Sequence, residues 1–389
     1  MTTLHSQGTT FPSRTATVRK RPAGMGTGHS LTVAVRSYSE FIMLELGPDN
    51  LMDYLCRTSR LSSADAAKSY AEALSGGVSN VVMRVCVPNG EDFVVKQSRA
   101  QLRTQAAWFS QPERIWRERD VLDVLSLVTP PGVVPKRLFE DRDNYLFAME
   151  AIPREHLVWK SSLLNGEVDA SIARRLGEIL AAIHSRTTND AELRERLGDR
   201  TIFDELRLDP FYRYMAQRQA ELRPALERLI DETMATTTCL VLGDFSPKNI
   251  LLVPTESGSD GQRPRLVLVD FETGHFGDPA FDLGFFLSHL LLKTIKHAAR
   301  ADNFMNMIRA FWSAYRGADF QPANERRSVA HLAACLRARV DGKSTVDYLT
   351  SEAQAFVRDI TRDWLLSPPD RVDSAFTDLR RRLKAICSC

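Results

Sequence analysis

The sequence predicts an α+β fold in which a small β-rich region precedes a larger α-rich region. Between residues 75 and 150, short β-branched runs alternate with turn signals around one charged helical segment. After Pro153, apolar residues recur every three or four positions over seven segments, which indicates amphipathic helices. The length of 389 residues suits two domains of ordinary size better than a single core.

Composition and charge exclude several classes of protein. The chain has 51 Lys+Arg against 49 Asp+Glu, so it lacks the positive field of a nucleic-acid-binding protein. Six cysteines are scattered without paired CxxC motifs, which favours reduced thiols, a cytoplasmic protein and no zinc site. No apolar run approaches the roughly 20 residues that cross a bilayer, so we expect no membrane partner.

Residues 1–39 differ in composition from the rest of the chain. They contain no acidic residue, carry five Lys or Arg and are rich in Ser, Thr and Gly, so we expect a disordered basic tail. The composition also resembles an organelle transit peptide, although it has no apolar core of a secretory signal. A solvated tail, or a start codon assigned too early, explains it equally well.

Residues 40–150 are expected to form the first domain. A turn signal at 88–90 joins two β-branched runs into a hairpin with a glycine-rich entrance, and a charged helix and a further strand follow. We expect helices at 51–55, 63–74 and 112–127, and strands at 81–87, 93–96 and 145–149.

Residues 151–389 are expected to form a second, mainly α-helical domain. One patch of short β-like runs interrupts the helices, with a polar turn in its middle. We expect helices at 172–184, 211–234, 281–295, 304–315, 329–340, 352–366 and 376–386, and strands at 239–242, 250–253 and 266–269. The β-like patch is where we expect the chemistry.

The hairpin carries candidate phosphate-binding groups. Gly76 and Gly77 would let the backbone approach a phosphate closely, with Ser79 and Asn80 as polar contacts, although a Gly-Gly pair before a strand is more often a simple turn. Lys96 ends the next strand, in a Val-Val-Lys context that resembles the lysine strand of kinases; an exposed strand-end lysine is the alternative.

A lysine near phosphates needs a carboxylate to orient it. The charged helix that follows Lys96 offers Glu118 and Glu113. Helical phase places Glu118 on the same side as the apolar positions, so we favour Glu118 over Glu113.

The strongest signal is a loop between two β-like runs. Asp244 and Asn249 are five residues apart in Gly-Asp-Phe-Ser-Pro-Lys-Asn, and Asp270 ends the apolar run that follows. A carboxylate and an amide separated by a tight loop can face one cavity, and the oxygens of Asn249 and Asp270 suit a hard cation such as Mg²⁺. Lys248 would neutralise charge on a transferred phosphoryl group, or it is a solvated loop lysine.

These motifs are similar to the catalytic loop and the metal-binding aspartate of the aminoglycoside phosphotransferase and choline kinase family, with the methylthioribose kinase branch as a narrower match. The resemblance extends over about residues 70–350 and includes the Gly-Asp-Pro segment at 277–279. It implies a protein-kinase-like two-lobed fold and transfer of the γ-phosphoryl of ATP, with Mg²⁺, to a hydroxyl of a small molecule such as a sugar or an amino alcohol.

The resemblance also implies roles for individual residues. Asp244 would accept the proton of the substrate hydroxyl, with Lys248 as a further catalytic residue, and Asn249 and Asp270 would hold magnesium. Asp282 would hold the backbone of the catalytic loop. The family usually has a histidine two residues before the catalytic aspartate, where this chain has Leu242. That departure keeps open an alternative, a nucleotide-binding pseudokinase with a regulatory role.

The resemblance extends to the adenine and substrate regions. The strand end at Met149, Glu150, Ala151 and Ile152 resembles the hinge that binds adenine through its backbone. Residues 301–389 hold 14 Lys+Arg and 11 Asp+Glu, which fits a neutral or anionic acceptor better than a polycationic one. The cations of segment 337–344 complement a helix C-terminus or form a substrate clamp. The acceptor and the oligomeric state stay open, a homodimer being one possibility.

Overall fold

The computed structural model describes residues 43–74, 80–88, 90–98, 112–255, 263–317 and 323–387. The predicted basic tail at 1–39 and the predicted phosphate contacts Gly76, Gly77 and Ser79 lie outside these residues. Residues 43–389 form one compact unit, and the predicted division at residue 150 stays a prediction.

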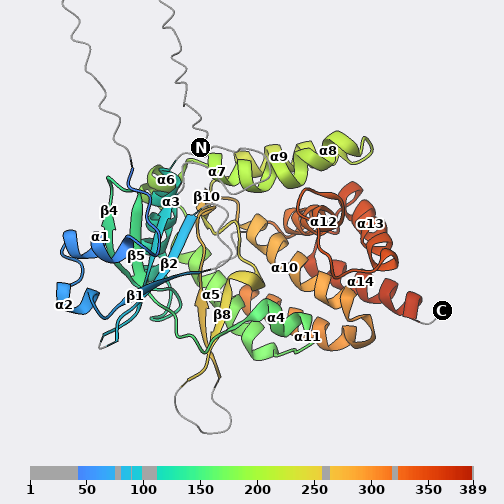
Figure 1. Cartoon of the computed structure of the whole chain (residues 1–389). Coiled ribbons are helices and arrows are strands. Elements are labelled where there is room, and N and C mark those ends of the chain that lie inside the picture. The colour runs from blue at the N-terminus through green and yellow to red at the C-terminus, as the bar shows by residue number, and fades with distance from the viewer. Residues whose placement is uncertain are drawn as a thin grey trace, which may run out of the picture. The chain divides into compact units, whose positions relative to one another are not determined.

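The first part of the described chain forms a five-stranded antiparallel sheet (Figure 1). Its strands, in the spatial order β1-β2-β3-β5-β4, are β1 (Tyr70–Ala73), β2 (Asn80–Cys86), β3 (Phe93–Ser98), β4 (Arg137–Asp141) and β5 (Leu146–Glu150). Lys96 pairs with Val82 on one side and Phe147 on the other, so it lies on the central strand. A second small core fills the space between this sheet and α1 (Leu51–Arg57).

Helix α3 (Arg114–Val128) contacts β3, β4 and β5 and carries Glu118 toward the sheet, as its helical phase predicts. By contrast, the predicted helix at 63–74 is wrong. Helix α2 ends at Ala66, and Tyr70–Ala73 is the edge strand β1, paired with β2. The small side chains Ala71 and Ala73 fit either structure, and pairing with β2 decides between them.

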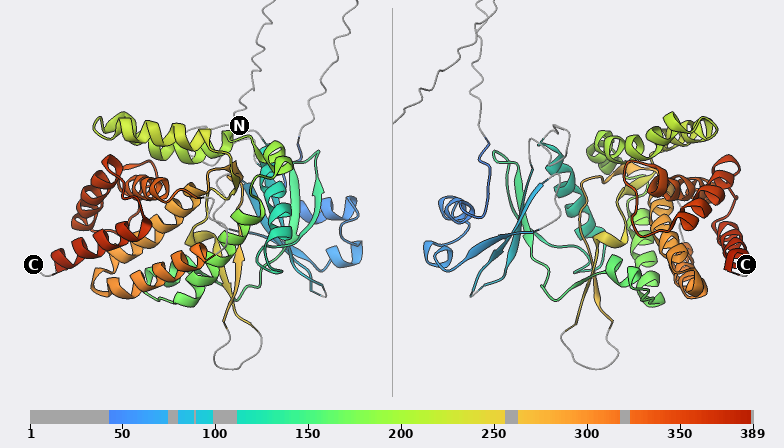
Figure 2. Two further views of the ribbon diagram at one scale, coloured as in Figure 1. Left: turned by 180° about the vertical axis from the view of Figure 1, so that it is seen from behind. Right: turned by 45° about the vertical axis from the view of Figure 1, so that its right-hand side comes forward.

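The second part of the described chain is mainly helical (Figures 1 and 2). Its α-helices are α4 (Trp159–Leu164), α5 (Ala170–Arg186), α6 (Ala191–Leu197), α7 (Thr201–Phe203), α8 (Tyr214–Arg218), α9 (Arg223–Ala235), α10 (Pro279–Lys296), α11 (Ala301–Arg316), α12 (Glu325–Asp341), α13 (Ser351–Leu366) and α14 (Val372–Cys387). A π-helical segment, η1, spans Asp204–Arg213, and short 3₁₀ turns η2 and η3 span Pro247–Asn249 and Ala298–Arg300.

The helix predicted at 211–234 is not continuous. It comprises the end of η1, then α8, and then α9 after a break at residues 219–222. Pro224 in the first turn of α9 favours a new helix start here, since proline lacks the N–H that a helix interior requires. The other six predicted helices correspond to α5, α10, α11, α12, α13 and α14.

The β-like patch forms two small antiparallel sheets that hold the central loop. Strand β7 (Cys239–Val241) pairs with β10 (His275–Gly277), and β8 (Ile250–Val253) pairs with β6 (Leu157–Val158) and β9 (Arg265–Leu268). The predicted strands at 239–242, 250–253 and 266–269 are therefore confirmed. They place residues 242–249 and 269–274 next to each other, and Val269 N–H donates to the Asn249 carbonyl at 3.1 Å.

Helix α10 runs through the middle of the large core, and every residue from Pro279 to Ile295 is buried. It packs very closely against α12. A Cβ on Gly284 would lie 2.4 Å from the Cβ of His331, so only glycine permits this distance between the two helices.

The fold class predicted from the sequence, an α+β protein-kinase-like arrangement with a β-rich first part and an α-rich second part, is confirmed. The cysteines Cys56, Cys86, Cys239 and Cys335 are free thiols. None of the helices in the described part of the chain is both long and apolar enough to cross a membrane.

Candidate active site

Lys96 and Glu118 form a buried ion pair. The lysine Nζ lies 2.6 and 2.7 Å from the two carboxylate oxygens of Glu118, and both side chains are nearly inaccessible. Burial alone would lower the pKa of Lys96, but Glu118 and Asp270 outweigh burial and raise it, so the lysine stays charged. The competing Glu113 instead accepts a hydrogen bond from the Tyr145 hydroxyl at 3.1 Å. The choice of Glu118 over Glu113 as the partner of Lys96 is confirmed.

The loop that carries Asp244 is held by a buried aspartate. Asp282, on the first turn of α10, accepts the backbone N–H of Leu242 at 2.7 Å and that of Gly243 at 2.8 Å. His184 Nε2 lies 3.2 Å from the same carboxylate, and the Tyr315 hydroxyl lies 2.9 Å from His184 Nδ1. Asp282 thus holds the loop backbone, as the resemblance implied.

Leu242 occupies the position at which the family usually has histidine. Its side chain belongs to the large core, its N–H binds Asp282, and its carbonyl accepts the Thr273 hydroxyl at 3.0 Å. The backbone of residue 242 therefore has two partners that do not depend on its side chain.

Asp244 is surrounded by hydrogen-bond donors and cations. Its Oδ2 lies 2.8 Å from Lys248 Nζ and 3.0 Å from an Arg207 guanidinium nitrogen, and it accepts a bond from Asn249 Nδ2 at 3.0 Å. Arg207 also donates to the carbonyl of Gly243 at 2.7 Å. The Asp244 side chain is only 5% exposed, whereas Lys248 is about half exposed, so a reactant can approach on the Lys248 side.

Gly243 and Asp270 both have backbone conformations in the left-handed region, each with φ of 70°. Glycine adopts this conformation without strain, but for an aspartate it costs on the order of 1–3 kcal/mol. Strain of this kind persists where the surroundings fix the backbone, and here it directs the Asp270 carboxylate toward Lys96, 3.3 Å away. Burial would raise the pKa of Asp270, but Lys96 and Lys248 outweigh it and lower the pKa, so the carboxylate is ionised.

The residues near Asp270 fit a magnesium site. The Asp270 side chain is about one-third exposed, and Asn249 uses its amide nitrogen toward Asp244, which leaves its oxygen free to face a cation. Within the described residues no three His, Cys, Asp or Glu side chains form a metal cage. Mg²⁺ at phosphoryl-transfer sites uses one or two protein carboxylates and completes its shell with water and phosphate oxygens. Asn249 and Asp270 match that pattern.

Two charged residues near the site were not singled out from the sequence. Arg207 reaches Asp244 from the π-helical segment, 37 positions earlier in the chain, and no local motif signals it. Glu272 follows Asp270 by two residues, and burial together with the Asp270 charge raises its pKa to about 7. The available signal for Glu272 was the Asp-Phe-Glu sequence, in which two carboxylates stand only two residues apart.

The structure describes two further groups of the predicted nucleotide contacts, Asn80 and the hinge residues 149–152. Asn80 begins β2, is buried, and its Oδ1 makes no hydrogen bond to any described residue. In the predicted adenine hinge, the Glu150 N–H donates a hydrogen bond to the Lys136 carbonyl, and the Ala151 N–H donates one to the Asp92 carbonyl. The Ile152 carbonyl accepts a hydrogen bond from the Arg84 guanidinium. Residues 149–152 are all half-buried. Adenine binding by this segment stays a prediction.

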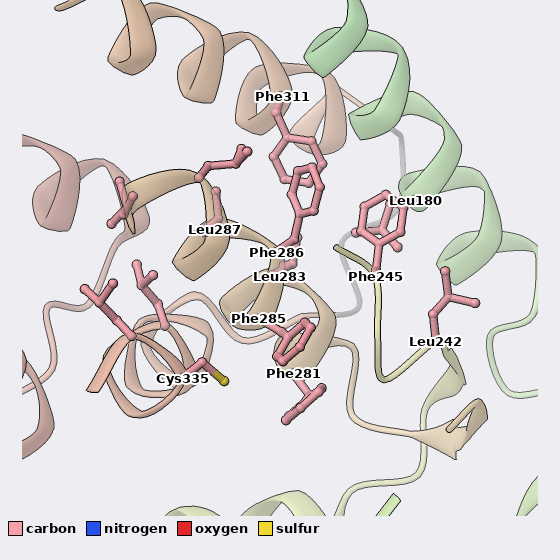
Figure 3. Packing of buried hydrophobic residues seen from close by; sticks show 14 of the residues in the cluster. Leu180, Leu242, Phe245, Phe281, Leu283, Phe285, Phe286, Leu287, Phe311 and Cys335 are labelled. Atoms are coloured by element: carbon pink, nitrogen blue, oxygen red, sulfur yellow. The ribbon is translucent and has the colours of Figure 1, made fainter. Parts of the chain in front are cut away.

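Aromatic side chains of the core pack against the loop that carries Asp244. Figure 3 shows Phe245 beside Leu180, and Phe286 beside Phe311. The Phe245 and Phe286 ring centres are 4.6 Å apart, and those of Phe286 and Phe311 are 4.5 Å apart. Since Phe245 directly follows Asp244, this packing ties the Asp244 loop to α10 and α11.

The chain is similar in sequence to two named kinases and aligns with one solved structure of a kinase family protein. The 4-hydroxytryptamine kinase of Psilocybe cyanescens is 24% identical over 314 residues, which cover 74% of this chain and 84% of the relative. The enzyme of the same name from Psilocybe cubensis is 24% identical over 269 residues, 63% of this chain and 73% of the relative. The structure of a choline/ethanolamine kinase family protein from Mesorhizobium loti aligns with a TM-score of 0.45 and 16% identity over 88% of this chain and 95% of that one.

A family model, the phosphotransferase enzyme family, matches residues 71–337. This span includes Lys96, the Asp244 loop and Asp270. The expectation of a small-molecule kinase is confirmed, while the narrower placement near methylthioribose kinase stays a prediction. The chain belongs to the phosphotransferase enzyme family.

Proposed function

We propose that the chain transfers the γ-phosphoryl group of ATP, in a magnesium-dependent reaction, to a hydroxyl of a small molecule. The observation that supports this most strongly is convergence: Lys96 from β3, with its partner Glu118, lies 3.3 Å from Asp270. Asn249 lies close to Asp270 in the fold, since its carbonyl accepts the N–H of Val269, the residue before Asp270. Four segments far apart in sequence thus supply the parts that phosphoryl transfer requires.

Each residue has a role in this proposal. Lys96 binds the phosphates and Glu118 keeps it in place. Asn249 and Asp270 hold magnesium, which supplies charge neutralisation on the phosphate oxygens when it is bound. Asp244 orients the acceptor hydroxyl and takes its proton, and Lys248, half exposed beside it, faces the transferred group. Residues 40–150 and 151–389 act as the two lobes, with adenine at Met149–Ile152.

The experiment is an ADP-release assay on the purified full chain with Mg·ATP and a panel of hydroxyl compounds. Asp244→Asn removes the proton acceptor but preserves the shape of the side chain, so kcat should fall by about 10²-fold or more while ATP still raises the melting temperature. Lys96→Met should instead weaken ATP binding. Normal turnover by both variants would contradict the proposed roles.

The pseudokinase alternative has weaker support. It was motivated by Leu242, and the bonds of its backbone to Asp282 and Thr273 give the loop support that does not require an imidazole. Melting-temperature stabilisation by Mg·ATP, without turnover of any acceptor in the panel, would favour it.

A further inference from the structure

Lys293 is a buried lysine to which the described residues supply no counter-ion. It lies on α10, is 1% exposed, and makes no hydrogen bond or ion pair with any described residue. Its Nζ lies 5.6 Å from the centre of the Tyr348 ring. Lysines are almost never fully buried unless they are paired, because removing an ammonium from water is costly. A buried lysine of this kind calls for a functional explanation.

The charges that act on Lys293 increase this cost. Burial, together with the charges of the neighbouring cations Lys160 and Arg339, lowers the pKa of Lys293 to about 7. The nearby His289 is kept neutral, because burial and the charges of Lys293 and Arg339 hold its pKa well below the ordinary value. The charges that act on Lys293 from the described part of the chain are thus all positive, and no carboxylate there offsets them.

This region connects directly to the catalytic loop. Phe285, His289 and Lys293 are four residues apart and lie on one face of α10. The Arg339 guanidinium lies 5.9 Å from the Phe285 ring centre, with one nitrogen 3.3 Å from His289 Nε2.

On the other side, the guanidinium of Arg207 lies 5.6 Å from the same Phe285 ring and is paired with Asp244. Arg207, Phe285 and Arg339 thus form a series of neighbouring side chains from Asp244 to His289, one helical turn before Lys293.

A further polar group in this region lacks a partner. The hydroxyl oxygen of Tyr348 is buried and forms no hydrogen bond within the residues that the structure describes. Arg339 donates to the carbonyl and hydroxyl of Ser344 and to His289, but to no carboxylate of the described chain. We call Arg207, His289, Lys293, Arg339 and Tyr348 the basic cluster.

We infer that the small molecule phosphorylated at Asp244 carries an anionic group, a carboxylate or a phosphate, that binds Lys293 and Tyr348, with Arg339 adding attraction. One such group would give the buried ammonium a counter-ion and the buried hydroxyl a partner. The inference rests on the proposed function for the hydroxyl that reacts. It separates this chain from the relatives named 4-hydroxytryptamine kinase, whose named compound is an amine, because an amine at the basic cluster would be repelled.

The test is anion binding, measured by calorimetric titration of inorganic phosphate and of glycolate into the full chain. Saturating Mg²⁺ and the non-hydrolysable analogue AMP-PNP keep the nucleotide site filled, so the added anion reports on a separate site. The wild type should bind the anion, and Lys293→Met should bind it at least about tenfold more weakly, since this variant lacks the buried charge that would pair with the anion.

Lys343→Met is the matched control. Lys343 follows α12 closely, is about half exposed and is paired with Asp209 at 3.0 Å, outside the basic cluster. Its substitution removes the same charge from the chain and should leave anion binding unchanged. Absence of binding to the wild type, or equal binding by Lys293→Met, would overturn the inference.

Turnover separates this inference from the proposed function. The acceptors are 6-hydroxytryptamine, 6-hydroxytryptophol and 6-hydroxyindole-3-acetic acid, which share a ring hydroxyl on the far side of the ring from the side chain and differ in the charge of that side chain. Faster turnover of the acid supports the inference, and faster turnover of the amine overturns it but leaves the proposed function intact. If ATP neither binds nor turns over, the proposed function fails, and the phosphate titration alone decides whether the anion site exists.

Discussion

The carboxylate of Asp282 should determine where the catalytic loop lies, and Asp282→Asn tests this. The substitution keeps the shape of the side chain but replaces one acceptor oxygen with an NH₂ group. Two donors, Leu242 N–H and His184 Nε2, converge on Oδ2, whereas Gly243 N–H alone binds Oδ1. The amide should therefore keep its oxygen at the Oδ2 position and leave Gly243 N–H facing a donor.

The expected magnitudes follow from this geometry. One buried donor without an acceptor costs about 1–3 kcal/mol, so the melting temperature should fall by a few degrees and the protein should still fold. Gly243 directly precedes Asp244, so its displacement moves the base. A misplacement of about 1 Å is enough to lower kcat by about 100-fold. The KM for ATP should change little, because Lys96, Glu118 and Asp270 are untouched.

Asp278→Asn is the matched control. Asp278 is an equally buried aspartate that caps the same helix, accepting from Ala280 N–H at 3.1 Å and pairing with Arg327, but it makes no bond to the catalytic loop. It should lose similar stability while keeping kcat within a factor of about three, as expected for a site that does not contact the loop. The assay is steady-state ADP release, with thermal unfolding of both variants. Equal losses of kcat in the two variants, or a normal kcat in Asp282→Asn, would refute the reasoning.

Two further changes test other parts of the structure. Lys293→Met should stabilise the folded chain. The pKa of Lys293 is about 7 in the folded chain and 10.5 in the unfolded chain, so the folded chain binds fewer protons between these pH values. The free energy of unfolding of the wild type therefore rises with pH over this range, by up to about 1.4 kcal/mol per pH unit. The melting-temperature advantage of the variant should therefore be largest at pH 7 and below and shrink toward pH 9; an advantage that is constant from pH 6 to 9 would show that Lys293 is not buried as a free amine. Gly284→Ala places a methyl group 2.4 Å from the Cβ of His331 and should cost about 1–3 kcal/mol by overpacking α10 against α12. Circular dichroism during thermal unfolding measures this cost, with Gly317→Ala as the control, since its nearest contact would be 3.3 Å; equal melting temperatures of the two variants would contradict the close packing.

The sequence was sufficient to predict that the candidate site residues lie at the ends of short strands. Asp244 and Asp270 follow short apolar runs and Asn249 precedes one, and antiparallel pairing brings the start of β8 next to the end of β9. Helical phase alone selected Glu118 over Glu113, because the apolar positions of α3 fix which face turns toward β3. These are local patterns, and local patterns are what a single sequence records best.

Contacts between segments that are distant in the sequence could not be predicted from such local patterns. Strand β1 was predicted as the end of a helix because its pairing partner β2 is not visible in its own residues. Arg207 meets Asp244 only through the course of the π-helical segment. The cations of residues 337–344 were interpreted mainly as helix-end charges, yet Arg339 faces His289 on α10 in the folded chain.

Helix α10 carries both Asp282 and Lys293, and this shared support has a consequence for the size of the acceptor. Eleven residues separate the two positions, which corresponds to about 16 Å along a helix axis at 1.5 Å per residue. Helical side chains lean toward the N-terminus, so the lysine recovers several ångströms of that distance. An acceptor that spans both ends would have its reactive oxygen and its charged end separated by something on the order of 10 Å, so two-carbon compounds would bind without being phosphorylated.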